Sequence, residues 1–334
     1  MILVTGGTGL VGSHLLYHLA LENDAIRAIY RTENSLEKVK KVFSYYTDDV
    51  DHLFSKIDWI LADITDVPSL EKAFKNVTYV YHCAAVVSFD SREYRMMRQV
   101  NIDGTANVVN LSIDKKIQKL CFISSIAAVG DSIHNHIVTE ENEWNIDGNN
   151  SGYSITKYGA EMEVWRASQE GVDVVIVNPG VILGPGFWDI NTGTMFSKVY
   201  KGFRYYTEGI TGFVGVNDVA KVMLLLIKSD VKNERYILVS ENISFREVFS
   251  SIAKGFDKKT PTIKISKLVT SIAWRLDFVL SKLTGKTQQL TKEASKSLHK
   301  KTYYSSDKLT SSTKFRFEPI VDVIRIVCKC YVSK

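Results

Sequence analysis

The chain has 334 residues, of which 45% are hydrophobic and 24% are charged. This composition is typical of a folded globular protein and excludes a disordered chain, and the length allows one large domain with an added lobe, or two domains. The net charge of +5 is unevenly distributed: residues 251–334 carry 18 Lys and Arg against 6 Asp and Glu, a net charge of +12, whereas residues 1–250 carry a net charge of −7. The basic segment 251–334 is predicted to be a solvated surface, or else a region that attracts an anionic substrate or surface.

Short runs rich in Val and Ile alternate with helical patterns over the first 180 residues. The predicted strands are 2–5, 25–31, 57–63, 77–85, 119–125 and 172–180. The predicted helices between them are 9–21, 34–43, 69–75, 93–115 and one that begins near Tyr153. This alternation predicts a parallel sheet covered by helices on both faces. In such folds, binding residues gather at the carboxyl ends of the strands.

The pattern changes after residue 180. Residues 182–212 are rich in Gly and aromatic residues and are predicted to form a loop with a short helix, followed by a helix at 216–229 and a strand at 234–240. Beyond Ser244 the chain is predicted to be helical, with no further strand. We therefore predict a nucleotide-binding domain formed by residues 1–181 plus about 213–243. A smaller lobe, formed by about 182–212 plus 244–334, is predicted to set the substrate.

The smaller lobe holds several aromatic residues that could line a substrate site or equally form its core, namely Phe187, Trp188, Phe196, Tyr205, Tyr206 and Trp274. The stretch 267–283 is the one amphipathic candidate for binding a membrane surface, but we expect it to cover the core of the lobe instead. No run of eighteen uncharged apolar residues is present in the sequence. Membrane association is therefore not expected.

A glycine-rich turn follows the first predicted strand. Gly6 permits a tight turn, Gly9 lets the backbone approach a pyrophosphate, and Gly12 lets the helix pack close to the strand. At the start of an alternating strand and helix pattern, this spacing predicts phosphate binding. His14 and His18 lie four residues apart on the same helix, but without a third ligand they are expected to be surface or packing residues.

Two Tyr-x-x-x-Lys pairs occur, Tyr153 with Lys157 and Tyr304 with Lys308. The first pair begins a helix and follows a strand that ends in a serine pair. The Tyr and Lys side chains then share one helix face. Such a Tyr could polarise a carbonyl while a hydride arrives, with the ammonium lowering its pKa and Ser125 donating a hydrogen bond to the developing oxyanion. The second pair follows no strand end with a serine, so it is expected to be structural.

Eight segments of the chain resemble the extended short-chain dehydrogenase/reductase superfamily, and most of all its dihydroflavonol reductase-like branch. They are "TGGTGLVG", "YRTENS", "ADITD", "YHCAA", "VNIDGTANVV", "FISSIAAVG", "NEWNIDGNNSGYSITK" and "NPGVILGPG". The resemblance implies an α/β fold, a Rossmann-type doubly wound parallel sheet with a smaller, mainly helical C-terminal substrate lobe. It implies a monomer or a homodimer.

The resemblance also implies the roles of individual residues. The catalytic residues would be Ser125 (rather than Ser124, from its distance to Gly130), Tyr153 and Lys157, with Asn101 structural. Thr156 stands where many relatives have Ser, which we expect to be neutral. The implied cofactor-binding residues are Gly6, Thr8, Gly9, Leu10, Val11, Gly12, Arg31, Asp63, Ile64, Ala84, Ala85, Tyr153, Lys157, Pro179, Gly180 and Val181.

The function that the sequence favours is an NADP-dependent reductase of an aldehyde or ketone, with a small carbonyl or alcohol molecule as its substrate. Arg31 at the end of the second strand suits the 2′-phosphate of NADP, although NAD remains possible. The alternatives are an NAD-dependent nucleotide-sugar epimerase or dehydratase, a 3β-hydroxysteroid dehydrogenase-like enzyme, and a non-catalytic cofactor-sensing protein. No nucleic acid partner is expected.

The four cysteines show neither a disulfide framework nor zinc spacing, and no metal site is predicted from them. The chain enters an apolar strand pattern at Ile2 without a preceding basic region, so no signal peptide is expected. A reducing, cytoplasmic setting is therefore predicted.

Overall fold

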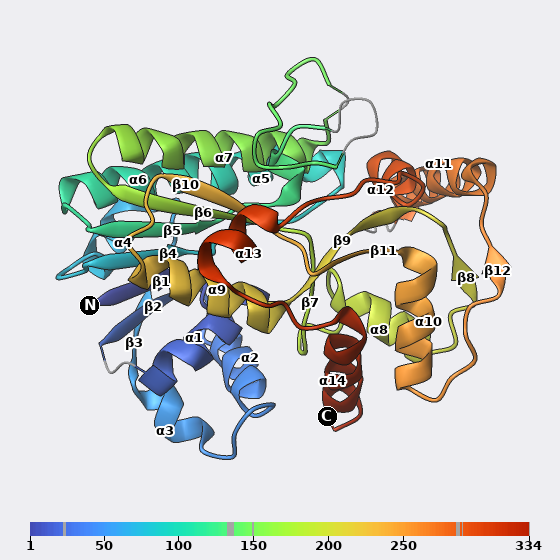
Figure 1. The fold of residues 1–334 in the computed structure, drawn as a ribbon, viewed down its shortest axis with the longest axis horizontal. Coiled ribbons are helices and arrows are strands. Elements are labelled where there is room, and N and C mark those ends of the chain that lie inside the picture. The colour runs from blue at the N-terminus through green and yellow to red at the C-terminus, as the bar shows by residue number, and fades with distance from the viewer. Residues whose placement is uncertain (23–24, 132–136, 149, 285–287, 289, 334) are drawn as a thin grey trace.

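A parallel sheet of seven strands forms the centre of the computed structural model, which describes residues 1–22, 25–131, 137–148, 150–284, 288 and 290–333 (Figure 1). The strand order is β10-β6-β5-β4-β1-β2-β3, and every neighbouring pair is parallel. The strands are β1 (Ile2–Thr5), β2 (Ile26–Tyr30), β3 (Ile57–Leu61), β4 (Tyr79–His82), β5 (Lys119–Ile123), β6 (Asp173–Pro179) and β10 (Glu234–Leu238). The predicted Rossmann-type sheet is confirmed.

Helices cover both faces of this sheet (Figure 1). One apolar core joins the sheet to α1 (Leu10–Glu22), α2 (Asn34–Phe43), α3 (Val50–Ser55) and α9 (Val216–Lys228). A second core joins its other face to α4 (Val67–Ala73), α6 (Gly104–Asp114) and α7 (Gly152–Gln169). Because both faces are buried, the strands carry continuous Val and Ile runs, and β5 is buried throughout.

The predicted helix at 93–115 is not continuous. It consists of η1 (Ser91–Glu93), α5 (Tyr94–Arg98), a π-helical turn η2 (Gln99–Asp103) and α6. Asn101 lies buried in the π turn, where its side chain bonds both the N–H and the C=O of Val86 and donates to Thr156. The wider turn lets Asn101 tie the loop after β4 to helix α7, which hydrophobic periodicity does not reveal.

The rest of the chain forms a smaller lobe with its own core. A three-stranded sheet, β11-β9-β7, is made of β7 (Val181–Leu183), β9 (Ile210–Gly215) and β11 (Glu241–Ser244). The strand β8 (Tyr205–Tyr206) pairs with β12 (Ile263–Lys264). Its helices are α8 (Gly193–Tyr200), α10 (Phe245–Gly255), α11 (Lys267–Thr284), α12 (Lys292–Ser297) and α14 (Ile320–Val332), whereas α13 (Asp307–Thr313) packs against β10 of the main sheet with Leu309 in the first core.

Two sequence-based expectations for this lobe were wrong. Residues 182–212 hold strands as well as the predicted helix, and β12 lies beyond Ser244. These strands of two to six residues pair with distant segments, so local periodicity gives little sign of them. The proposed division into two domains stays a prediction. Among the predicted aromatic residues, Trp188 and Phe196 pack in the core, whereas Tyr205 is exposed.

Candidate active site

The glycine turn between β1 and α1 has the geometry of a phosphate cradle. Gly6 has φ +67°, and a Cβ there or at Gly12 would overlap backbone atoms of Ala84 or of Gly6. At Gly9, by contrast, a Cβ would meet only the Gly6 carbonyl oxygen, at 3.4 Å. The turn is therefore closed on its inner side and open at Gly9, where the first N–H groups of α1 are available to an anion. These residues fit a dinucleotide pyrophosphate.

The residues predicted for the adenosine side of the cofactor also come together. Arg31 directly follows β2, its side chain is 67% exposed, and Nη1 lies 3.8 Å from Oδ2 of Asp63. The other carboxylate oxygen, Oδ1 of Asp63, accepts hydrogen bonds from the N–H and the hydroxyl of Thr65, both at 2.8 Å. Ile64 buries its side chain, and Gly104 leaves room for it. The Ile64 side chain is therefore not available to a ligand, and its carbonyl oxygen accepts a hydrogen bond from Asn107 Nδ2 at 2.9 Å.

The remaining predicted cofactor residues lie at the same edge of the sheet. Ala84 and Ala85 follow β4, beside the glycine turn. Pro179 ends β6, Gly180 donates its N–H to the Leu238 carbonyl, and Val181 begins β7. Three residues of the turn are partly exposed and available for contact, namely Thr8, Leu10 and Val11.

The three candidate catalytic residues meet at the end of β5. Ser125 follows that strand, and Tyr153 lies in the first turn of α7, which begins with a capping box formed by Ser151 and Ser154. Burial raises the pKa of Tyr153, and a hydrogen bond with the Ser125 side chain acts in the opposite direction. Serine and tyrosine hydroxyls therefore lie together, where a carbonyl oxygen could bind both.

Lys157 lies one turn further along α7 and is buried. Its Nζ donates a hydrogen bond to the Ile123 carbonyl at 2.8 Å and lies 4.5 Å from the centre of the Phe122 ring. Burial lowers the pKa of Lys157 to about 8, against the opposing effect of Glu161. The predicted lowering of the Tyr153 pKa by this ammonium was wrong for this structure. Burial dominates the pKa of Tyr153, while Lys157 is held by a backbone carbonyl.

A buried polar network behind these residues was not predicted. The fully buried carboxylate of Glu161 accepts hydrogen bonds from Ser124 Oγ (2.6 Å), Asn178 Nδ2 (2.9 Å) and Arg235 Nη1 (3.2 Å). Asn178 Nδ2 also donates to the Ser125 carbonyl, at 3.0 Å. The network therefore holds the segment that carries Ser125. One signal was present in the sequence, since Glu161 follows Lys157 by four residues and shares its helix face.

The second Tyr-x-x-x-Lys pair makes structural contacts. Lys308 Nζ binds Glu234 at 2.6 Å, and Tyr304 is largely buried, which raises its pKa to about 12. His14 has partners as well, because its ring nitrogens bond Tyr46 Oη (2.6 Å) and the Pro185 carbonyl (3.0 Å). Within the described part of the chain, no group of three or more His, Cys, Asp or Glu residues could hold a metal ion.

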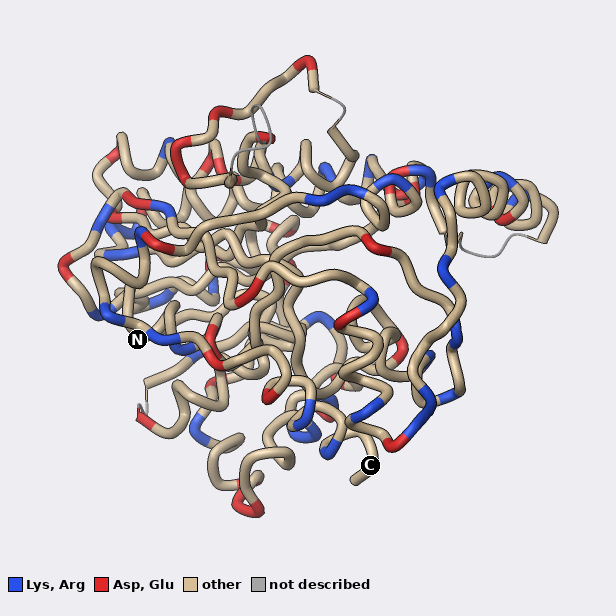
Figure 2. Tube along the Cα trace, turned by 45° about the vertical axis from the view of Figure 1, so that its right-hand side comes forward, with Lys and Arg blue, Asp and Glu red and all other residues tan. Residues whose placement is uncertain are grey.

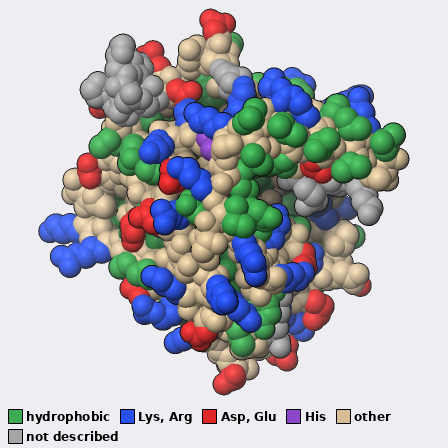
Figure 3. Space-filling view, turned by 90° about the vertical axis from the view of Figure 1, so that its right-hand side faces the viewer, with side chains coloured by type: hydrophobic (Ala, Val, Ile, Leu, Met, Phe, Trp, Pro, Cys, Tyr) green, Lys and Arg blue, Asp and Glu red, His purple; other side chains and the backbone are tan. Residues whose placement is uncertain are grey.

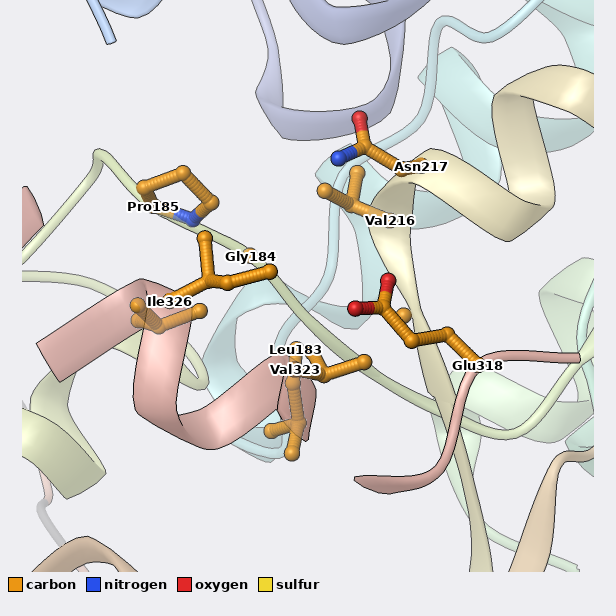
Figure 4. A pocket seen from close by; sticks show the side chains of 10 residues that line it. Leu183, Gly184, Pro185, Val216, Asn217, Glu318, Val323 and Ile326 are labelled. Carbon is orange, nitrogen blue, oxygen red and sulfur yellow. The ribbon is translucent and has the colours of Figure 1, made fainter. Parts of the chain in front are cut away.

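A shallow hollow lies elsewhere on the surface, between the end of β7, the start of α9 and α14 (Figure 4). It is lined mainly by apolar side chains and by Asn217 and Glu318. None of the candidate catalytic residues lines it, so we do not connect it with the chemistry of the site.

Comparison with known proteins identifies the family and the fold. Residues 2–238 match the NAD dependent epimerase/dehydratase family. A putative dihydroflavonol 4-reductase of Synechocystis is 27% identical over 316 residues, covering 91% of this chain and 87% of that protein. A UDP-glucose 4-epimerase of Vibrio cholerae is 29% identical over 307 residues, covering 86% of each chain. The crystal structure of gox2253 is similar in fold, with a TM-score of 0.81 at 24% identity, covering 100% of this chain and 98% of that one.

No helix among the described residues is long and apolar enough to cross a membrane. The family match covers most of the chain, and the relatives include both reductases and epimerases. The chain therefore belongs to the NAD dependent epimerase/dehydratase family, within the extended short-chain dehydrogenase/reductase superfamily, and is an NAD(P)-dependent enzyme of the oxidoreductase type.

Proposed function

We propose that this protein is an NADP-dependent reductase that converts an aldehyde or ketone of a small molecule to the alcohol, in the cytoplasm. The observation that carries the proposal is the meeting of Ser125, Tyr153 and Lys157 at the carboxyl end of β5, at the same edge of the sheet as the open glycine turn. Carbonyl reduction needs a proton donor and a hydrogen-bond donor at one oxygen, and these hydroxyls supply both.

The roles of the residues follow from their protonation. When bound, NADPH would supply the hydride for the carbonyl carbon. Tyr153 is protonated at neutral pH, since the ordinary pKa of tyrosine is about 10 and burial raises the pKa of Tyr153 further, so it can donate its proton to the carbonyl oxygen. Ser125 would hold the same oxygen by a hydrogen bond. Lys157 would bind the nicotinamide ribose through its ammonium group.

Arg31 supports NADP over NAD. Its guanidinium is exposed at the end of β2 and pairs with Asp63 only loosely, at 3.8 Å. An exposed pair of this kind contributes little, so a phosphate could replace the carboxylate as the partner of Arg31. Asp63 itself could accept hydrogen bonds from a ligand, which keeps NAD binding possible.

The second candidate is a nucleotide-sugar epimerase, which the Vibrio cholerae relative favours. Native mass spectrometry of the purified protein under anaerobic conditions separates the two, followed by a screen of carbonyl substrates with NADPH and NADH. Exchangeable NADPH with carbonyl reduction is the expected result. Tightly retained NAD, with no net reduction of any carbonyl, would contradict the proposal and support the epimerase.

A further inference from the structure

Helix α11 carries a row of large apolar side chains on the surface of the smaller lobe. The row consists of Leu268, Val269, Ile272, Leu276, Val279, Leu280 and Leu283, which are between 51% and 77% exposed. With 3.6 residues per turn, these seven positions fall within an arc of about 120°. We call this row the α11 stripe. Our expectation that the apolar face of this segment covers the core of the lobe was wrong.

The opposite side of α11 faces the protein. Thr270 and Ser281 are its buried residues, and Thr270 Oγ1 bonds His299 Nε2 at 2.9 Å. The inward side therefore combines the buried Thr270 and Ser281 with the partly buried Trp274, and the outward side has the leucines, isoleucine and valines. An ordinary surface helix keeps polar residues on its outward side, so the exposed α11 stripe indicates an apolar partner.

Basic residues lie along one edge of the stripe and on the neighbouring helix. Arg275 and Lys282 lie along one edge of the apolar arc, and Lys292 and Lys296 are exposed on the neighbouring helix α12. Figure 2 shows Lys and Arg along this end of the molecule, and Figure 3 shows hydrophobic side chains gathered beside them at its edge. Segment 251–334 carries 18 Lys and Arg against 6 Asp and Glu. An apolar stripe with basic flanks matches an anionic bilayer surface, where the stripe meets acyl chains and the cations meet headgroups.

The same helix is connected to the candidate active site. Gln288, four residues beyond α11, donates its side-chain N–H to the Trp274 carbonyl at 3.3 Å, and its backbone N–H bonds the Asp90 carboxylate. The residue before Asp90 is Phe89, whose ring centre lies 5.9 Å from that of Tyr153. The loop after β4 thus contacts both the candidate proton donor and the segment that follows α11.

We propose that the α11 stripe docks this protein on the surface of an anionic lipid bilayer. Docking brings the loop of Phe89 and Asp90 close to the membrane, so apolar molecules dissolved there reach Tyr153 over a short path. A second copy of this chain fits the stripe less well, because two lobes of net positive charge would repel each other. The docking proposal does not depend on the proposed reductase activity.

Vesicle flotation of the full chain tests the proposal. The vesicles contain phosphatidylcholine alone, or phosphatidylcholine with 30 mol% phosphatidylglycerol, on the order of the anionic content that polybasic segments recognise. The wild type is expected to float with the anionic vesicles, and less so as salt increases. The double variant Leu276→Glu with Val279→Glu should weaken this binding at least tenfold. Arg275→Gln with Lys282→Gln should weaken it about 25-fold, at about fivefold for each cation lost.

A matched control is available on α14, where Val321 and Val332 are 52% and 63% exposed, compared with 59% for Leu276 and 53% for Val279. The double variant Val321→Glu with Val332→Glu should bind vesicles like the wild type, and circular dichroism should show that all variants are folded. Anionic vesicle binding that survives both α11 double variants would overturn the proposal. So would equal binding to the two kinds of vesicle. Absence of vesicle binding together with a dimer that the Glu variants dissociate would also overturn it, in favour of a self-association surface.

Discussion

Replacing Glu161 with Gln tests whether the buried network positions the catalytic residues and maintains the charge of Lys157. Glu161 is fully buried and accepts hydrogen bonds from Ser124, Asn178 and Arg235. Gln keeps the size of the side chain but removes its negative charge. Its amide N–H₂ group would also face at least one of these three hydrogen-bond donors, with which it cannot form a hydrogen bond as an acceptor. The change therefore leaves Arg235 without its carboxylate.

The expected loss of stability follows from the surroundings of Arg235. Breaking a fully buried ion pair reduces stability by about 3–5 kcal/mol. Arg235 is 19% exposed and keeps hydrogen bonds to the carbonyls of Glu140 and Asn142, so we expect about 2 kcal/mol. For 334 residues the unfolding entropy is about 0.7 kcal/mol/K, which converts the loss to a Tm about 3 °C lower.

The effect on activity follows from the pKa of Lys157. Burial lowers this pKa to about 8, and the negative charge of Glu161 raises it. If the protonated amine is needed, kcat/KM should fall above about pH 8 in the wild type, and Glu161→Gln should move that fall to lower pH. Initial rates from pH 6 to 10 measure this shift, with differential scanning calorimetry for Tm. Glu161→Asp, which keeps the charge, should restore the pH profile more than the stability.

Glu163→Gln is the matched control, because Glu163 lies on the same helix but pairs with Arg166 at the surface. It should leave both Tm and the pH profile nearly unchanged. A normal pH profile in Glu161→Gln together with reduced Tm would refute the electrostatic part of the reasoning and leave Glu161 a purely structural residue.

Three further predictions concern the site. Tyr153→Phe should lower kcat at least 100-fold with cofactor affinity nearly unchanged, and Tyr304→Phe should keep kcat within a few-fold; equal activities would contradict the assignment. Arg31→Ala should weaken NADPH binding about tenfold in calorimetric titration and leave NADH binding within about threefold, since only a phosphate needs the cation. Gly9→Ala should keep Tm within about 2 °C but weaken cofactor binding, whereas Gly12→Ala should lower Tm by more, because of these two positions it is Gly12 where a Cβ overlaps the backbone. The same change in Tm for both variants would be evidence against the cradle.

Much of the sheet could be predicted because its information is local. The first six strands were placed within three residues of their observed bounds, since each is a Val- and Ile-rich run between helical patterns. The interruption at Asn101 could not be predicted, because it depends on hydrogen bonds to Val86 and Thr156, 15 and 55 residues away. The strands β8 and β12, of two residues each, depend on each other in the same way.

The candidate site was only partly accessible from the sequence. The spacing of the motifs predicted that Ser125, Tyr153 and Lys157 lie close together at the end of one strand. In the structure they lie at the end of β5. Their protonation depends on surroundings that spacing does not specify. The Lys157 ammonium donates a hydrogen bond to the Ile123 carbonyl. Burial raises the pKa of Tyr153, whereas the sequence led us to expect that Lys157 would lower it. Tyrosine is already protonated at neutral pH with its ordinary pKa, so this upward shift leaves Tyr153 with a proton to donate.

Helix α11 likewise shows that a sequence pattern does not specify the surroundings of a surface helix. An apolar arc in a sequence specifies that one face of a helix prefers a non-aqueous neighbour, but it does not specify the neighbour. Here the lobe accepts the Thr270 and Ser281 side of the helix, so the α11 stripe remains outside. Exposing seven large apolar residues to water is unfavourable by about 1.5 kcal/mol or more for each side chain that could have been fully buried. A partner that covers these side chains at least part of the time removes that penalty. Because Arg275 and Lys282 lie along the stripe, the partner must offer negative charge as well as an apolar phase, and a negatively charged bilayer offers both.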